Sequence, residues 1–132
     1  MLPTRLALVL RDDLPPNLAA NAAVNLGLTL GSRLPDLLGE DAEDADGGVH
    51  PGLNTHPVPV LTASADVLRA LHRAAGDDVL RIGFTEVARR SRSYPEYVEA
   101  LARTTDPEFV AVALYGPRTD VNRLTRRLPL MA

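Results

Sequence analysis

Three asparagines recur at intervals of four residues near the start of the chain, at Asn17, Asn21 and Asn25. Because residues four apart lie on the same side of an α-helix, this spacing predicts a polar stripe on a helix otherwise rich in alanine and leucine. A buried amide without a partner costs about 1–3 kcal/mol, so each side chain needs hydrogen bonds. Two interpretations remain open. The stripe lines a ligand cleft, or Asn17 caps the helix while the others bond to backbone and water.

A charged triplet, Arg11, Asp12 and Asp13, precedes this stripe and follows a short apolar run. Two neighbouring carboxylates can divide acid and base roles when their environments differ. Pockets of α/β proteins favour the carboxyl ends of strands, so we expect Asp12, Asp13 and Asn17 beside such a pocket. The alternative is an exposed turn in which the acids bond to local backbone groups.

Three histidines, His50, His56 and His72, could move protons near neutral pH. They match neither an HExxH nor an HxH pattern, and the chain has no cysteine, so the sequence predicts no metal site. His50 lies in a long loop, where functional residues are often found, and we expect it to line a pocket or shuttle a proton. His72 lies on a predicted helix and is expected at the surface.

All 14 basic residues are arginines, and lysine is absent from the chain. This composition excludes a Schiff-base lysine, a phosphate-loop lysine and a lysine general base. The net charge of −3 argues against binding of nucleic acid through overall charge. A basic end made by Arg118, Arg123, Arg126 and Arg127 either contacts phosphate or RNA or is a solvated surface. No cofactor is predicted.

No apolar run approaches the roughly 18 residues that a membrane-spanning helix needs. The first residues also lack the order of a secretion signal, in which basic residues precede an apolar core and a small-residue cleavage site follows it. We therefore expect a cytoplasmic protein with no membrane partner. A length of 132 residues predicts one domain over residues 1–132.

The candidate residues need a scaffold, and apolar runs alternate with helical patterns along the chain. Strands are predicted at 6–10, 57–61, 78–84 and 109–115, the second at a sheet edge because of its two prolines. Helices are predicted at 17–30, 64–75, 86–103 and 120–126, with a terminator at Gly31 and a break at Pro95. The segment 32–57 is predicted to be a long acidic surface loop that could hold a short hairpin. This alternation favours an α/β fold with a largely parallel sheet.

Both ends of the chain resemble peptidyl-tRNA hydrolase II. The strand–helix opening over 8–14 and 17–23 is similar to the start of that family, and 115–117 with the helix and apolar tail after it is similar to its end. The middle, with Asp46-Gly47, His50-Pro51-Gly52, Phe84-Thr85 and Tyr94, resembles an uncharacterised bacterial family grouped with that fold. The resemblance implies a three-layer α/β/α sandwich with a mixed, mostly parallel four-stranded sheet, and a homodimer.

Two positions depart from the hydrolase pattern. Asn17 stands where those hydrolases keep a lysine, four residues before Asn21, and Ala111 stands where they carry a threonine hydroxyl. An amide cannot replace an ammonium group in stabilising an oxyanion by charge, and alanine offers no hydroxyl. Losing one such donor typically costs about 10²- to 10³-fold in rate. The resemblance therefore implies the fold more strongly than the activity.

The candidate site combines residues from several predicted elements. The candidates for catalysis are Asn17, Asn21, Asp12, Asp13 and His50. The candidates for ligand binding are Arg11, Asn25, Tyr115, Gly116 and Arg118. Two functions remain open. One is a hydrolase-like protein or binder that takes an acyl, peptidyl or nucleotide-derived small ligand at the first strand–helix junction. The other is a non-catalytic dimeric binding or regulatory module that kept the fold and lost the site.

Overall fold

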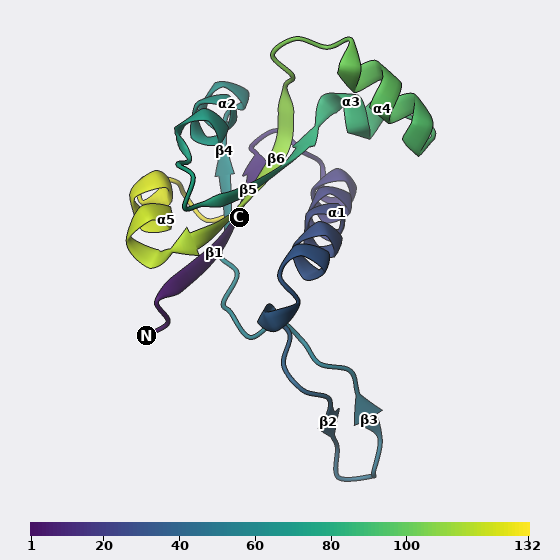
Figure 1. Cartoon of the computed structure of the whole chain (residues 1–132), viewed down its shortest axis with the longest axis vertical. Coiled ribbons are helices and arrows are strands. Elements are labelled where there is room, and N and C mark those ends of the chain that lie inside the picture. Colours follow the sequence, from purple (N-terminus) through teal and green to yellow (C-terminus); the bar gives the residue numbers. More distant parts are fainter.

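The central strand β1 (Thr4–Arg11) forms where an uninterrupted apolar run predicted it. The computed structural model describes residues 1–132 (Figure 1). Strand β4 (Val60–Ala63) pairs with β1 on one side and lies at the sheet edge, as its prolines predicted. Strand β6 (Phe109–Pro117) pairs with β1 on the other side, and β5 (Leu80–Thr85) lies outermost beside β6. The order is β4-β1-β6-β5.

The sheet is mixed, as expected, but the expectation that it is mostly parallel was wrong for neighbouring strands. Only β1 and β4 pair in parallel, whereas β6 runs antiparallel to both β1 and β5. The cause is the connection from β5 to β6 through α3 (Glu86–Arg90) and α4 (Tyr94–Ala102). These helices stay at one end of the sheet (Figure 1), and Glu86 N donates to Glu108 O at 2.9 Å. The chain therefore re-enters the sheet at the end where it left.

Alternating side chains of β1 point to two separate apolar clusters, as the period of a strand requires. Ala7 and Val9 join the cluster covered by α2 (Ala65–Ala74) and α5 (Arg118–Thr125). Leu6, Leu8 and Leu10 join the other cluster, to which α1 (Pro16–Arg33) contributes four buried residues. Full burial of each leucine or valine side chain in these clusters stabilises the fold by about 1.5–3 kcal/mol. The sheet is thus covered by helices on both faces.

Helix α1 is longer than predicted and continues through Gly31, so the expected glycine terminator was wrong. It ends at Arg33, with Leu34 as its C-cap, because Pro35 disfavours a helical conformation in the residue before it. The helix is apolar around much of its circumference, yet only one side is buried. Val24 is 61% exposed and Leu28 is 71% exposed. An apolar outer surface on α1 therefore remains uncovered in the single chain.

The predicted helix over 86–103 is interrupted, but not at Pro95. The break lies at residues 91–93, and Pro95 occupies the first turn of α4, where a missing N–H costs nothing. Ser93 caps α4 by accepting a hydrogen bond from Glu96 N at 3.2 Å. A short helix, a three-residue bend and a second helix therefore follow β5.

The acidic segment contains the short hairpin that its sequence allowed. A 3-10 turn (Pro35–Leu37) leads into β2 (Ala42–Glu43) and β3 (Val49–His50), which pair antiparallel. Gly47 supplies the positive φ of 83° that the connecting turn requires. Figure 1 shows this hairpin extending away from the sheet and its helices.

Candidate functional site

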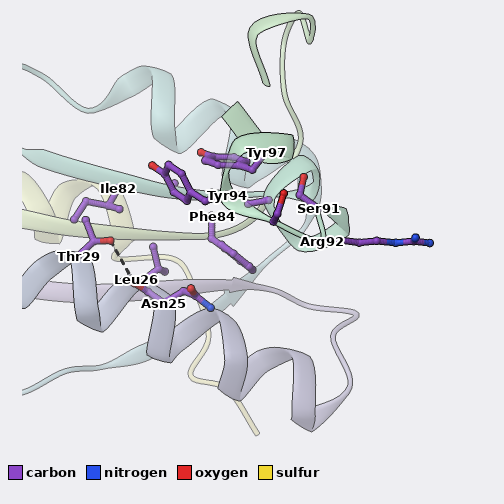
Figure 2. Close-up of a pocket in the computed structure, with 12 residues that line it drawn as sticks. Asn25, Leu26, Thr29, Ile82, Phe84, Ser91, Arg92, Tyr94 and Tyr97 are labelled. Atoms are coloured by element: carbon purple, nitrogen blue, oxygen red, sulfur yellow. Dashed lines mark hydrogen bonds between the residues drawn. The ribbon is translucent and has the colours of Figure 1, made fainter. Parts of the chain in front are cut away.

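A cavity of about 410 Å³ opens between α1, the edge strand β5 and the bend between α3 and α4 (Figure 2). Asn25 and Thr29 line it from α1, and Phe84 lines it from β5. Tyr94 and Tyr97 line it from α4. One wall thus carries an amide and a hydroxyl, while the opposite wall carries aromatic rings.

The asparagine stripe leads along α1 into this cavity. Asn25 Nδ2 donates to the backbone oxygen of Asn21 at 2.9 Å and to Asn21 Oδ1 at 3.3 Å. Thr29 Oγ1 donates to Asn25 O at 3.4 Å. These residues bond along the helix, and of the three asparagines Asn25 alone lines the cavity, so ligand binding by the stripe stays a prediction. The expected capping role of Asn17 was wrong, since α1 starts one residue earlier with Pro15 at its N-cap.

The aromatic wall depends on the spacing of α4. Tyr94 and Tyr97 are three residues apart on the helix, and their rings meet edge to face with centroids 5.5 Å apart. Tyr94 is 74% exposed, so most of its surface is open to solvent. Such rings offer both apolar faces and hydroxyl groups to a ligand.

Polar groups of the bend surround the mouth of the cavity. Ser91 Oγ donates to Val87 O at 2.7 Å, and Ser93 is occupied as the α4 cap. The guanidinium of Arg92 has no carboxylate partner, and Figure 2 shows its side chain extending away from the cavity. The bend therefore places an unpaired positive charge outside the cavity.

A network of charged groups connects the end of β1 to the start of α3. Arg11 Nη1 lies 3.1 Å from Glu86 Oε2, and Arg11 Nε lies 2.6 Å from Asp13 Oδ1. Glu86 also accepts a hydrogen bond from Arg89. Burial acts to raise the pKa of Glu86, but the bonds and charges of Arg89 and Arg11 outweigh it and hold that pKa below its ordinary value. The hydrogen bond from Arg11 likewise lowers the pKa of Asp13.

This network sets the chemistry available at the first strand–helix junction. Asp13 and Glu86 stay ionised and paired, so neither is poised to exchange a proton near neutral pH. Asp12 and Asn17 lie exposed at the same end of β1, but neither they nor Asp13 line the cavity, so the pocket expected beside them is not the one described above. Asp12 N donates to Ala63 O at 2.9 Å, which fixes its backbone to β4.

The remaining candidates lie elsewhere. His50 is on the protruding hairpin, with Nε2 at 2.7 Å from Asp44 Oδ2, and this contact lowers the pKa of Asp44. Tyr115 and Gly116 pair with Leu6 and Arg5, near the opposite end of β1 from the junction.

Arg118 belongs to that opposite end as well. Its Nε donates to the backbone oxygen of Leu2 at 2.7 Å. The candidates predicted for one pocket therefore occupy three regions: the junction with the α1 stripe, the hairpin, and the far end of β1.

Several residues that were not among the site candidates also meet in these regions. The cavity contains two of the three tyrosines and one of the two phenylalanines of the chain. Because aromatic residues are few in this sequence, the short distance between these three along the chain was the one signal that could have indicated the cavity. At the far end of β1, the Thr4 hydroxyl lies 2.8 Å from His56 Nε2 and accepts a hydrogen bond from Tyr115 at 3.2 Å. His72, expected at the surface, is partly buried and stacks on Phe109 with ring centroids 4.3 Å apart.

Metal-ligand geometry is not present in the structure. No three histidine, aspartate or glutamate side chains come together in an arrangement that could hold a metal ion. Among the helices, none combines the length and apolar character needed to cross a membrane.

The fold and cavity define a mixed α/β protein with a cleft between its first helix and an edge strand. The chain belongs to the family described as "Protein of unknown function (DUF2000)", whose pattern matches residues 4–132. Membership of an uncharacterised family, expected from the middle of the sequence, is thereby confirmed.

One solved structure is similar over its whole length. It is that of the protein of unknown function Atu0240 from Agrobacterium tumefaciens strain C58, which is 24% identical to this chain. The superposition gives a TM-score of 0.91 and covers 100% of both chains, so the two share a fold. No curated protein matches the chain.

Proposed function

We propose that this protein binds a small ligand with an acyl, peptidyl or nucleotide-derived group in the cavity between α1, β5 and α4. The observation that carries the proposal is a cavity of about 410 Å³ with polar side chains on one wall and aromatic rings on the opposite wall. Binding sites of this size combine apolar and aromatic surface with a few polar groups that fix orientation. Asn25 Oδ1 accepts no hydrogen bond within the chain, so it is free to accept one from a ligand N–H.

The finer fold assignment is part of the same proposal. A three-layer α/β/α sandwich of the peptidyl-tRNA hydrolase II kind accounts for helices on both faces of the sheet. In that arrangement the stripe that begins at Asn17 runs from the expected catalytic position toward the cavity. Arg92 and Ser93 line the cavity mouth.

Binding is favoured over hydrolysis by the groups around the cavity. Hydroxyls of Ser91 and Ser93 lie there, but no histidine lines the cavity to act as their general base. Asp13 and Glu86 are held ionised by arginines. Assays on peptidyl-tRNA and simple acyl esters, with an Asn21→Ala variant beside them, test the hydrolytic version. Turnover that Asn21→Ala abolishes would show that the protein is an enzyme.

The direct test is ligand-observed NMR with three probes: octanoate, an acetylated dipeptide amide and a nucleoside monophosphate. Tyr97→Ala is expected to weaken the binding of a probe at least tenfold, because it removes one aromatic wall. Val98→Ala is the matched control, since Val98 lies on the same helix, 50% exposed, and does not line the cavity. Binding that neither variant changes, or no binding of any probe, would remove the proposal.

We also propose that two copies of the chain associate. The exposed Val24 and Leu28 on α1 support this proposal, because side chains of this kind in one patch are typical of surfaces that another protein covers. Leu28→Glu is expected to convert a dimer into a monomer in light scattering coupled to size exclusion. A monomer in the unsubstituted protein at 100 µM or so would rule out the dimer.

A further inference from the structure

Strand β5 is an edge of the sheet with one side unpaired. It hydrogen-bonds only to β6, and no other strand or isolated bridge reaches it. In an antiparallel pair, successive residues direct their N–H and C=O groups alternately toward the partner and away from it. Part of the β5 backbone therefore faces outward without a partner, as a template for another strand.

The cavity lies against this edge. Ile82, Gly83 and Phe84 of β5 all line it. Gly83 has no side chain, and a Cβ there would lie 2.4 Å from Phe109 Cε1, on a position already filled by that ring. Gly83 can therefore contribute only backbone to the cavity wall. The cavity thus joins accessible main chain to the aromatic rings of Phe84, Tyr94 and Tyr97.

We propose that an extended peptide segment adds to β5 as a fifth strand and inserts one side chain between Phe84 and the two tyrosines. Main-chain hydrogen bonds would supply affinity, and the aromatic cavity would select the side chain, as in other cases of strand addition. The irregular register between Phe84 and Thr85 ends regular pairing, so the added strand spans the residues from Leu80 to Phe84. This inference rests on the proposed function and narrows it to a peptidyl ligand.

The charges around the edge indicate the chemistry of the peptide. Arg81 lies near the start of β5, where its Nη1 donates to Ala75 O at 2.5 Å, and Arg92 lies beyond the end of β5; neither has a carboxylate partner. A peptide with acidic residues at both ends would complement them. Edge-to-edge pairing with a second copy of β5 would instead bring the same arginines together, which is unfavourable. The occupant that fits is an acidic peptide with a central aromatic residue.

The probe is an acetylated and amidated heptapeptide with a central phenylalanine, flanking valines and threonines, and an aspartate at each end. Its matched control carries N-methyl groups on alternate backbone nitrogens, which remove the ladder donors and keep every side chain. We expect the control to bind at least tenfold more weakly in calorimetry. We also expect the parent peptide to slow hydrogen exchange of the outward-facing amides of β5.

Further outcomes separate this inference from the proposed function. A peptide with lysines in place of the aspartates is expected to bind at least fivefold more weakly, and Tyr97→Ala is expected to weaken the parent peptide while Val98→Ala does not. Equal binding of the parent and N-methylated peptides, or unchanged exchange in β5, would overturn strand addition while leaving the cavity as a ligand site. Binding of the small probes without binding of the parent peptide would do the same. Failure of every peptide and every small probe would overturn both.

Discussion

Arg11 and Glu86 form an ion pair of 3.1 Å that joins the carboxyl end of β1 to the first residue of α3. Both side chains are largely buried, at 16% and 10% exposure. Because α3 leads directly into the bend and α4, this pair anchors the start of the segment that carries the two cavity tyrosines. The charged network at the junction therefore ties the start of α3 to the end of β1.

Replacing Glu86 with alanine is expected to lower the free energy of unfolding by about 2–4 kcal/mol. Removing one member of a largely buried pair leaves the other without full compensation, although Arg11 keeps Asp13. Urea unfolding at pH 7 measures the change. The matched control is Glu99→Ala, which breaks an exposed pair with Arg103 and is expected to cost less than about 1 kcal/mol. Equal losses in the two variants would contradict the structural role of Glu86.

Acid is expected to weaken the fold through the same carboxylate. The pKa of Glu86 is lower in the folded chain than its ordinary value of 4.5, so the unfolded chain takes up the proton first. The stabilisation is fully present above that ordinary value and is lost as pH falls through the lower pKa of the folded state. Unfolding measured from pH 7 to pH 3 should therefore depend less steeply on pH in Glu86→Gln. Identical pH profiles would show that another group is responsible.

His72 should titrate below the ordinary histidine value of 6.5. Burial lowers its pKa, and the charge of Arg81 lowers it further. The neutral ring is therefore the form that the fold favours, and its contribution to stability is present above pH 6.5 and lost as pH falls through the lower folded pKa. NMR titration of the imidazole protons measures this directly. A His72 midpoint at or above 6.5 would contradict the stacked, partly buried position on Phe109.

Gly83→Ala is expected to destabilise the protein by about 1–3 kcal/mol, because the new methyl group would overlap the Phe109 ring. Phe109→Leu in the same chain should recover part of that loss, since it removes the atoms that clash. Thermal unfolding of the two single variants and the double variant gives the coupling between the positions. Additive losses would mean that Phe109 is not what requires glycine at this position.

Local patterns predicted most elements of this fold. Ser64 caps α2 by accepting a hydrogen bond from Val67 N, as its position before an apolar helical repeat indicated. The prolines before Val60 placed β4 at an edge. The helix end predicted at Gly31 and the break predicted at Pro95 were wrong because both residue types are compatible with helices. Glycine is tolerated inside a helix that tertiary contacts stabilise, and proline is favourable in a first turn as well as at a break.

The cavity could not be predicted from such patterns, because its walls come from distant parts of the chain. Nothing near Arg11 indicates a partner 75 residues away in Glu86. Asn25 and Tyr97 line the same cavity only because β5 and the α3–α4 bend pass beside α1. His50 was misplaced for the same reason, since loop composition does not tell whether a loop folds over the sheet or away from it.

The hairpin that stands away from the sheet also divides the charge of the molecule. Residues 38–55 hold five of the 17 acidic residues and none of the 14 arginines, so the remainder of the chain carries more arginines than acids. The net charge of −3 therefore combines a negative hairpin with a slightly positive remainder, which gives the molecule an electric dipole along the hairpin. At low ionic strength such a dipole would turn the molecule as it approaches a charged surface. At physiological salt, charges are screened beyond about 8 Å, so this orientation acts only at short range. There an anionic partner would meet the arginine-bearing part of the molecule first.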